Sequence, residues 1–189
     1  MNRSLVAVAL AVGALAGPVS AAEPLRPGYK VGEPLQLWFH EYRVTGRGPG
    51  LGCALVCTYS TRPVVMVYTR AIDAPLQRLI RKLDEATAAC KDERLGSYVV
   101  LLCDRPGREG ELKALQRCEK IRHTLLALVV SNNWGRFRAK FGAEAETTII
   151  LATPERRVKV CYAYRKGELK DKDVEQILAD IAKILPKKE

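Results

Sequence analysis

Residues 64–75 read VVMVYTRAIDAP, a continuous apolar run followed by a helix-start signal. The run from Val64 to Tyr68 has no charged side chain, as expected of a strand whose two faces are both covered. Asp73 can cap a helix, and Pro75 fits the first helical turn because its missing N–H is not needed there. The sequence therefore predicts a buried strand, followed at once by a helix that runs to about residue 91.

Alternating strands and helices are predicted on the C-terminal side of this stretch. Apolar runs indicate strands, and apolar positions that repeat every three or four residues indicate helices. The last two strands are separated by a connection short enough for an antiparallel hairpin. The order βαβαβ, a short helix, ββ and α predicts one α/β domain. The elements expected after residue 91 are strands over 98–103, 125–130, 147–152 and 158–165, and helices over 109–122, 134–141 and 171–185.

The N-terminal side of the stretch predicts a strand, a loop and two cysteines. Residues 35–44 are expected to form a first strand or hairpin arm, anchored by Trp38 and Phe39. Glycines and a proline crowd residues 45–52, which is typical of a flexible loop. Cys53 and Cys57 follow directly.

This order of elements resembles the thioredoxin fold. Residues 31–34, VGEP, resemble the segment that leads into peroxiredoxin-type domains, and residues 62–68, RPVVMVY, resemble the strand that leads into their active site. The resemblance covers roughly residues 31–185. It implies an α/β thioredoxin-like fold, with a central mixed sheet and helices on both faces.

Two departures from the family pattern affect the expected active site. Residues 69–72, TRAI, are similar to the peroxiredoxin Thr-x-x-Cys, with Ile72 in place of the attacking cysteine. Residues 145–148, AETT, resemble the segment that usually holds a cis-proline, and Glu146 takes the place of that proline. The usual peroxiredoxin or thioredoxin mechanism therefore does not transfer to these residues, and whether the protein is an enzyme stays open.

Cys53 and Cys57 are the candidate catalytic residues that remain. In an extended strand their Cα atoms would lie about 13 Å apart, too far for a disulfide. In a helical turn the separation falls to about 6 Å, within disulfide range. The pair can therefore be an exchanging redox pair, with Arg62 or Arg70 favouring a thiolate. The alternative is a permanent disulfide that fastens the loop, as small secreted domains often have.

The other four cysteines have simpler interpretations. Cys90 and Cys118 fall on the apolar stripes of their helices and are expected to face the core. Cys103 ends one strand and Cys161 lies within another, so a disulfide between them across the sheet is a further option.

Copper binding is the third hypothesis for the cysteine pair. The C-x-x-x-C spacing resembles that of thioredoxin-fold copper chaperones, although their pair follows the first core strand. Cys53 and Cys57, with a nitrogen from His40 or His123, would give the soft ligand set that Cu(I) prefers. No cofactor and no metal ligand are part of the leading prediction.

The N-terminal leader predicts export. Residues 1–22 have the charged, apolar and small-residue regions of a signal peptide, and residues 23–34 are an extended lead-in. The thioredoxin-like domain is expected over 35–186, with a basic tail at 187–189. The net charge is +10, but the basic residues are interleaved with acidic ones along the chain, so nucleic-acid binding is not expected. No segment after the leader is long and apolar enough to span a membrane.

These features predict an exported thioredoxin-fold protein, periplasmic or secreted. The leading hypothesis is a thiol-disulfide oxidoreductase that uses Cys53 and Cys57 on a protein partner or a protein disulfide. The alternative is a redox-inactive module that binds another protein or has a structural role.

Overall fold

The computed structural model describes residues 25–36, 40–46, 48–52, 55–104, 106–130, 138–141 and 144–186. Among these residues, no helix has the length and apolar character needed to cross a bilayer. Several predicted features lie outside them: the leader over 1–22, Trp38 and Phe39, Cys53, the first half of the short helix over 134–141, and the tail over 187–189.

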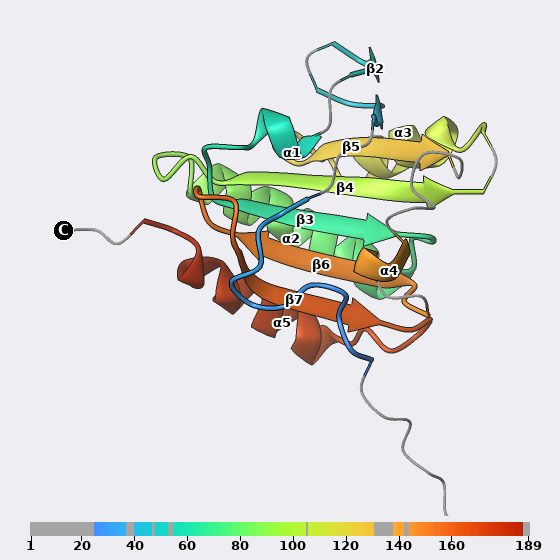
Figure 1. Ribbon diagram of the computed structural model, residues 1–189. Coiled ribbons are helices and arrows are strands. Elements are labelled where there is room, and N and C mark those ends of the chain that lie inside the picture. Colours follow the sequence, from blue (N-terminus) through green and yellow to red (C-terminus); the bar gives the residue numbers. More distant parts are fainter. Residues whose placement is uncertain are drawn as a thin grey trace, which may run out of the picture.

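Seven strands of the described residues form one mixed sheet, in the order β2-β1-β5-β4-β3-β6-β7 (Figure 1). β3, β4 and β5 are parallel, whereas β6 is antiparallel to β3 and β7 is antiparallel to β6. The predicted parallel core and C-terminal hairpin are confirmed. The strands are β1 (Tyr42–Arg43), β2 (Gly50–Leu51), β3 (Val64–Thr69), β4 (Gly96–Cys103), β5 (Leu125–Val130), β6 (Thr147–Ala152) and β7 (Val158–Tyr164).

Each face of the sheet carries its own hydrophobic core, because successive strand residues point to opposite faces. Val65 and Val67 of β3 lie in the first core, with residues of α2, α3 and α5. Met66 and Tyr68 lie in the second core, with residues of α1 and α4. Figure 1 shows α2 and α5 behind the sheet and α1 and α4 in front of it. The predicted α/β class with helices on both faces is therefore confirmed. The helices are α1 (Leu55–Thr58), α2 (Ala74–Ala89), α3 (Glu109–Cys118), α4 (Arg138–Phe141) and α5 (Asp171–Ala179), which a 3₁₀ turn over Asp180–Lys183 extends.

The predicted first strand over 35–44 is wrong in extent. Pro34 forms a bridge with Arg157, next to β7 at one side of the sheet. Tyr42 pairs with Leu128 of β5, near the other side. The two ends of the predicted range therefore lie toward opposite sides of the sheet, and no single strand covers it. Among the described residues of 35–44, only Tyr42–Arg43 forms a strand, β1. It pairs with β5 on one side and forms a short hairpin with β2 on the other.

Helix α2 follows β3 as predicted. The side chain of Asp73 accepts a hydrogen bond from the N–H of Leu76 at 3.0 Å and so caps the helix. Pro75 lies in the first turn. The predicted apolar stripe is buried in the first core: Leu76, Leu79, Ile80 and Leu83.

The predicted inward position of Cys118 is wrong. Helix α3 ends at Cys118 instead of residue 122, and Lys120 turns the chain with a φ of 55°. Ile121 reaches the first core from beyond this turn. Cys118 lies in the last helical turn, where no further turn covers it, and it is exposed.

The buried carboxylate of Asp84 on α2 fixes the connection between α3 and β5. It accepts hydrogen bonds from the N–H groups of Arg122, His123 and Thr124, at 3.1, 2.6 and 2.6 Å to Oδ1. Three backbone donors, which have no partner from a helix or strand here, are thereby satisfied by one side chain. This bonding ties α2 to the start of β5.

Candidate functional site

The end of β3 is fixed by two buried hydroxyl groups. The hydroxyl of Thr69 donates to the carbonyl of Ala71 at 2.6 Å and lies 2.9 Å from the hydroxyl of Thr147 on β6. The hydroxyl proton of Thr69 is thus engaged in a hydrogen bond within the loop. The loop from Arg70 to Ile72 is held at the edge of the sheet, where ligands of open α/β sheets collect.

Ile72 stands where the peroxiredoxin Thr-x-x-Cys pattern, which residues 69–72 resemble, has its cysteine. It lies directly before Asp73, the cap of α2, and packs partly buried against the first core. A thiolate at the N-terminus of a helix is stabilised by the helix dipole and the free N–H groups. The aliphatic side chain of Ile72 has no nucleophile that could use this position.

Glu146 takes the position of the expected cis-proline with ordinary backbone geometry. No described peptide bond is cis. The N–H of Glu146 donates to the carbonyl of Tyr164 at 2.8 Å, and its carbonyl accepts from the N–H of Arg70 at 3.0 Å. Glu146 therefore links β7 to the loop that carries Ile72 through its backbone.

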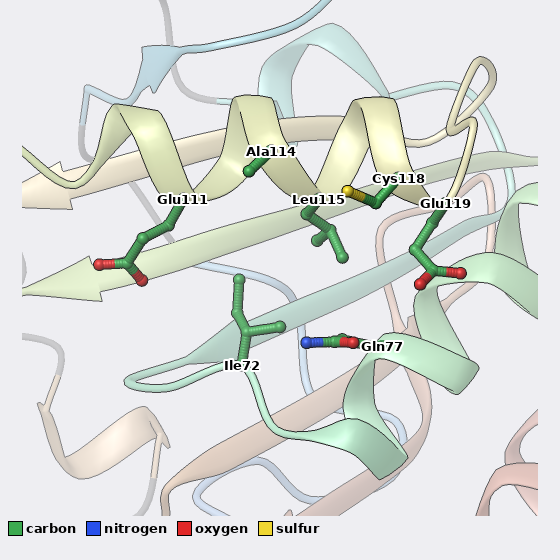
Figure 2. Close-up of a pocket in the computed structure, with 7 residues that line it drawn as sticks. All are labelled: Ile72, Gln77, Glu111, Ala114, Leu115, Cys118 and Glu119. Carbon is green, nitrogen blue, oxygen red and sulfur yellow. The ribbon is translucent and has the colours of Figure 1, made fainter.

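A pocket of about 340 Å³ opens between Ile72 and α3 (Figure 2). Figure 2 shows Ile72 and Leu115 pointing toward one another across it. Gln77, Glu111 and Glu119 give the pocket a polar rim. The guanidinium of Arg108 donates to both carboxylate oxygens of Glu111, at 2.8 and 2.7 Å, and holds the pKa of that carboxyl low.

Cys118 also lines this pocket, which no signal in the sequence indicated. Its position on the apolar stripe of α3 predicted burial, because the stripe does not show where the helix ends. The pocket therefore has an apolar floor with one exposed thiol at its wall, and no thiol at the family position.

Cys57 lies far from Ile72. It is on α1, which precedes β3, whereas Ile72 follows β3, a strand that spans roughly 17 Å. Its side chain packs half-buried against the second core, and Ile72 packs against the first. Arg70 lies in the loop of Ile72 and not beside Cys57, so the expectation that Arg70 favours a thiolate at Cys57 is wrong. Arg62, whose N–H bonds the carbonyl of Tyr59, lies in the turn that follows α1.

A buried carboxyl group next to α1 was not predicted. Glu41 is 1% exposed, and its Oε2 accepts a hydrogen bond from the N–H of Leu55 at 3.0 Å. Burial raises the pKa of Glu41 to about 7. This burial has no sequence signal, because Glu41 stands in the polar run His40-Glu41-Tyr42-Arg43, which is typical of an exposed strand.

A disulfide between Cys103 and Cys161 is excluded by the sheet. β4 and β7 are separated by β3 and β6, which places the two residues about 14 Å apart, beyond the disulfide limit of about 7 Å. They also pack on opposite faces. Burial raises the pKa of Cys103, and it raises the pKa of Cys161 to about 11, so both thiols stay protonated at neutral pH.

A metal centre does not emerge from the described side chains. Among them, no three His, Cys, Asp or Glu residues are grouped to hold an ion. The Nδ1 of His40 is engaged with the carbonyl of Gly52 at 3.0 Å. His123 lies in the loop bonded to Asp84. The copper hypothesis depends on Cys53, which is outside the described residues.

No protein-family model and no curated protein matches the sequence. The thioredoxin domain of a thiol-disulfide oxidoreductase from Bacteroides vulgatus matches with a TM-score of 0.57 and 15% identity, over 79% of this chain and 99% of that one. A secreted disulfide oxidoreductase of Mycobacterium tuberculosis, homologous to E. coli DsbE, matches with a TM-score of 0.57 and 8% identity, over 78% and 96%. A peroxiredoxin-like protein from Aquifex aeolicus matches with a TM-score of 0.55 and 14% identity, over 84% and 91%.

The fold is therefore thioredoxin-like, as the sequence predicted. Its structural neighbours include thiol-disulfide oxidoreductases and peroxiredoxin-like proteins. The chain thus has a thioredoxin-like fold, with isoleucine where the peroxiredoxin pattern that it resembles has a cysteine.

Restoring a thiol at this position should restore its reactivity. The Ile72→Cys variant should carry a thiol with a pKa below the ordinary value of about 8.5, because it would lie at the N-terminus of α2. At pH 7 we expect its alkylation by iodoacetamide to be about tenfold faster than that of Cys118, measured by mass spectrometry of the labelled peptides. The Ala71→Cys variant is the control for a new thiol one residue away. A thiol introduced at position 72 that reacts no faster than Cys118 would contradict this account of the site.

Proposed function

We propose that the protein is an exported thiol-disulfide exchange protein in which Cys53 and Cys57 perform the chemistry that Ile72 cannot. Cys57 carries this proposal: it is partly exposed on α1, and the C-x-x-x-C spacing supplies a second cysteine that a helical turn would bring within disulfide range. Export is supported by the signal-peptide character of residues 1–22 and by the likeness to a secreted oxidoreductase.

Cys103, Cys161 and Cys118 are less suited to disulfide exchange than Cys57. Cys103 and Cys161 are disfavoured as nucleophiles, because burial raises the pKa of each. Cys118 is exposed but has no cysteine close to it in sequence that could resolve a mixed disulfide. Cys57 alone among the described thiols combines accessibility with a neighbouring cysteine at a suitable spacing.

The exchange needs no cofactor. A thiolate of the reduced pair attacks one sulfur of a substrate protein disulfide and forms a mixed disulfide, and the other substrate sulfur leaves as a thiolate. The second thiol of the pair, after losing its proton, then attacks the mixed disulfide. The substrate ends as a dithiol and the pair as a disulfide, so two electrons pass from the pair to the substrate.

The test is the reduction potential of the pair. We expect a value between about −270 and −120 mV in glutathione buffers, the range of exchanging pairs, with alkylated cysteines assigned by mass spectrometry. The Cys57→Ser variant should lose disulfide reduction of a model protein substrate, and the matched Cys118→Ser variant should keep it. A potential below about −300 mV, or equal activity in both variants, would contradict the proposal.

A redox-inactive binding module is the second candidate. It is favoured by the pocket at Ile72, whose floor of Ile72, Ala114 and Leu115 offers apolar contact where the family pattern has a thiol. A structural disulfide between Cys53 and Cys57, with no exchange, would be the expected companion of this function.

A further inference from the structure

Glu41 holds Gly52 and Leu55, the described residues on either side of positions 53 and 54. The carbonyl of Glu41 accepts from the N–H of Gly52 at 3.2 Å, and its carboxylate accepts from the N–H of Leu55 at 3.0 Å. These two bonds lie on either side of residues 53 and 54. One residue therefore fixes the chain both before Cys53 and at the start of α1.

The other end of α1 is held by the same strand. The guanidinium of Arg43 donates to the hydroxyl of Thr58 at 2.9 Å. Leu55 and Val56 of α1 are buried in the second core. Glu41 and Arg43 thus attach both ends of the short helix to β1 and its preceding residue.

Few titratable groups surround the carboxyl of Glu41. The groups that face it are Arg43 on β1, Tyr68 on β3 and Tyr98 on β4. The two tyrosine hydroxyls bond each other at 2.9 Å, and burial holds both of their pKa values well above the ordinary range. His40, whose ring bonds Gly52, is exposed nearby. Near neutral pH, neither tyrosine changes charge beside Glu41.

Burial is the dominant influence on Glu41. It raises the pKa of the carboxyl to about 7, although the hydrogen bonds from Leu55 and from its own backbone, and the charge of Arg43, act in the lowering direction. The protonated form is therefore favoured while α1 stays packed. An ionised carboxylate regains its hydration only if the segment above it opens.

We propose that Glu41 is a positioning residue for α1, the helix that carries Cys57, keeping α1 packed when neutral and favouring its opening when ionised. The role in redox chemistry rests on the proposed function, whereas the positioning itself does not. Acidic conditions would keep Cys57 only partly exposed, and a rise in pH would expose its thiol further.

The size of the effect follows from proton linkage. The carboxyl ionises near pH 7 in the packed state and near its ordinary value of 4.5 when exposed to water. Opening that hydrates Glu41 should therefore become roughly 10- to 30-fold more frequent between pH 5.5 and 8.5. The effect should be local to the segment that covers Glu41.

Amide hydrogen exchange of the full chain tests the inference directly. The exchange rate of the Leu55 amide, divided by that in the Glu41→Gln variant, should rise roughly 10- to 30-fold from pH 5.5 to 8.5, because the ratio cancels the intrinsic pH dependence. The Arg70 amide, bonded to Glu146 at the opposite end of β3, should show a flat ratio. If the variant does not fold, the Leu55 amide shift of the wild-type protein should still titrate with a midpoint near 7.

The thiol is followed in the same samples by alkylation of Cys57. The wild-type to variant ratio of its rate constants should rise over the same pH range. A flat Leu55 ratio, no titration of its shift, or a flat Cys57 ratio would each overturn the inference. Failure of the proposed function is separate, since it would appear as a pair that does not exchange with disulfides even though these ratios rise.

Discussion

The Glu41→Gln variant should gain about 3 kcal/mol in the free energy of unfolding, relative to the wild-type protein, between pH 4 and pH 9. The pKa of Glu41 is raised from 4.5 to about 7 in the folded state. Between these values the folded protein holds a proton that the unfolded chain has released. The contribution of protonated Glu41 to the free energy of unfolding is therefore complete below pH 4.5 and is lost as the pH rises through 7. Glutamine keeps the shape and does not titrate.

Urea unfolding at a series of pH values measures this difference. Only its change with pH matters, because the amide of glutamine adds a constant penalty of its own. Glu111→Gln is the control with the opposite sign, since the hydrogen bonds from Arg108 lower the pKa of Glu111. That variant should lose stability relative to wild type as the pH rises, and only in the acidic range. A pH-independent difference for Glu41→Gln would refute the prediction.

The Asp84→Ala variant should lose about 4 kcal/mol of stability at pH 7. Asp84 is 8% exposed and accepts from three consecutive backbone N–H groups of the loop before β5. Alanine leaves these donors without their acceptor in a site where water reaches poorly. Asp84→Asn should lose less, because one side-chain oxygen can still accept, although its NH₂ group faces the same donors.

Urea unfolding with an exposed aspartate as control distinguishes this bonding from a general charge effect. Asp171→Ala removes an ion pair with Arg78 whose side chains are 73% and 44% exposed, and it should change stability by less than about 1 kcal/mol. Equal losses for the two alanine variants would rule out a special role of Asp84.

The central part of the fold was predictable because each signal there is local. The strands β3, β4 and β5 contribute side chains to the cores on both faces of the sheet. Apolar residues therefore follow one another along each strand and mark it in the sequence. Asp73 and Pro75 mark the start of α2 within a few residues. The position of Ile72 followed from these two signals, which located the end of the strand and the start of the helix.

The features that were predicted incorrectly or missed depend on contacts between residues distant in sequence. Pro34 and Tyr42 lie toward opposite sides of the sheet because they pair with Arg157 and Leu128, more than 80 residues away. The burial of Glu41 arises because α1 folds over it, 14 residues later. Cys118 was misplaced because its exposure depends on where α3 ends, and the positive φ of Lys120 has no strong marker in the sequence.

The backbone bonds of Glu146 restrict how this sequence can change. A proline at this position could not donate to Tyr164, so a direct substitution would remove a bond that joins β7 to the loop of Ile72. A mutation that introduces a cysteine at position 72 is tolerable alone, but one that introduces the proline is penalised until its neighbours adapt. Descendants of this sequence would therefore gain a nucleophile more readily than the backbone that the family pattern places around it.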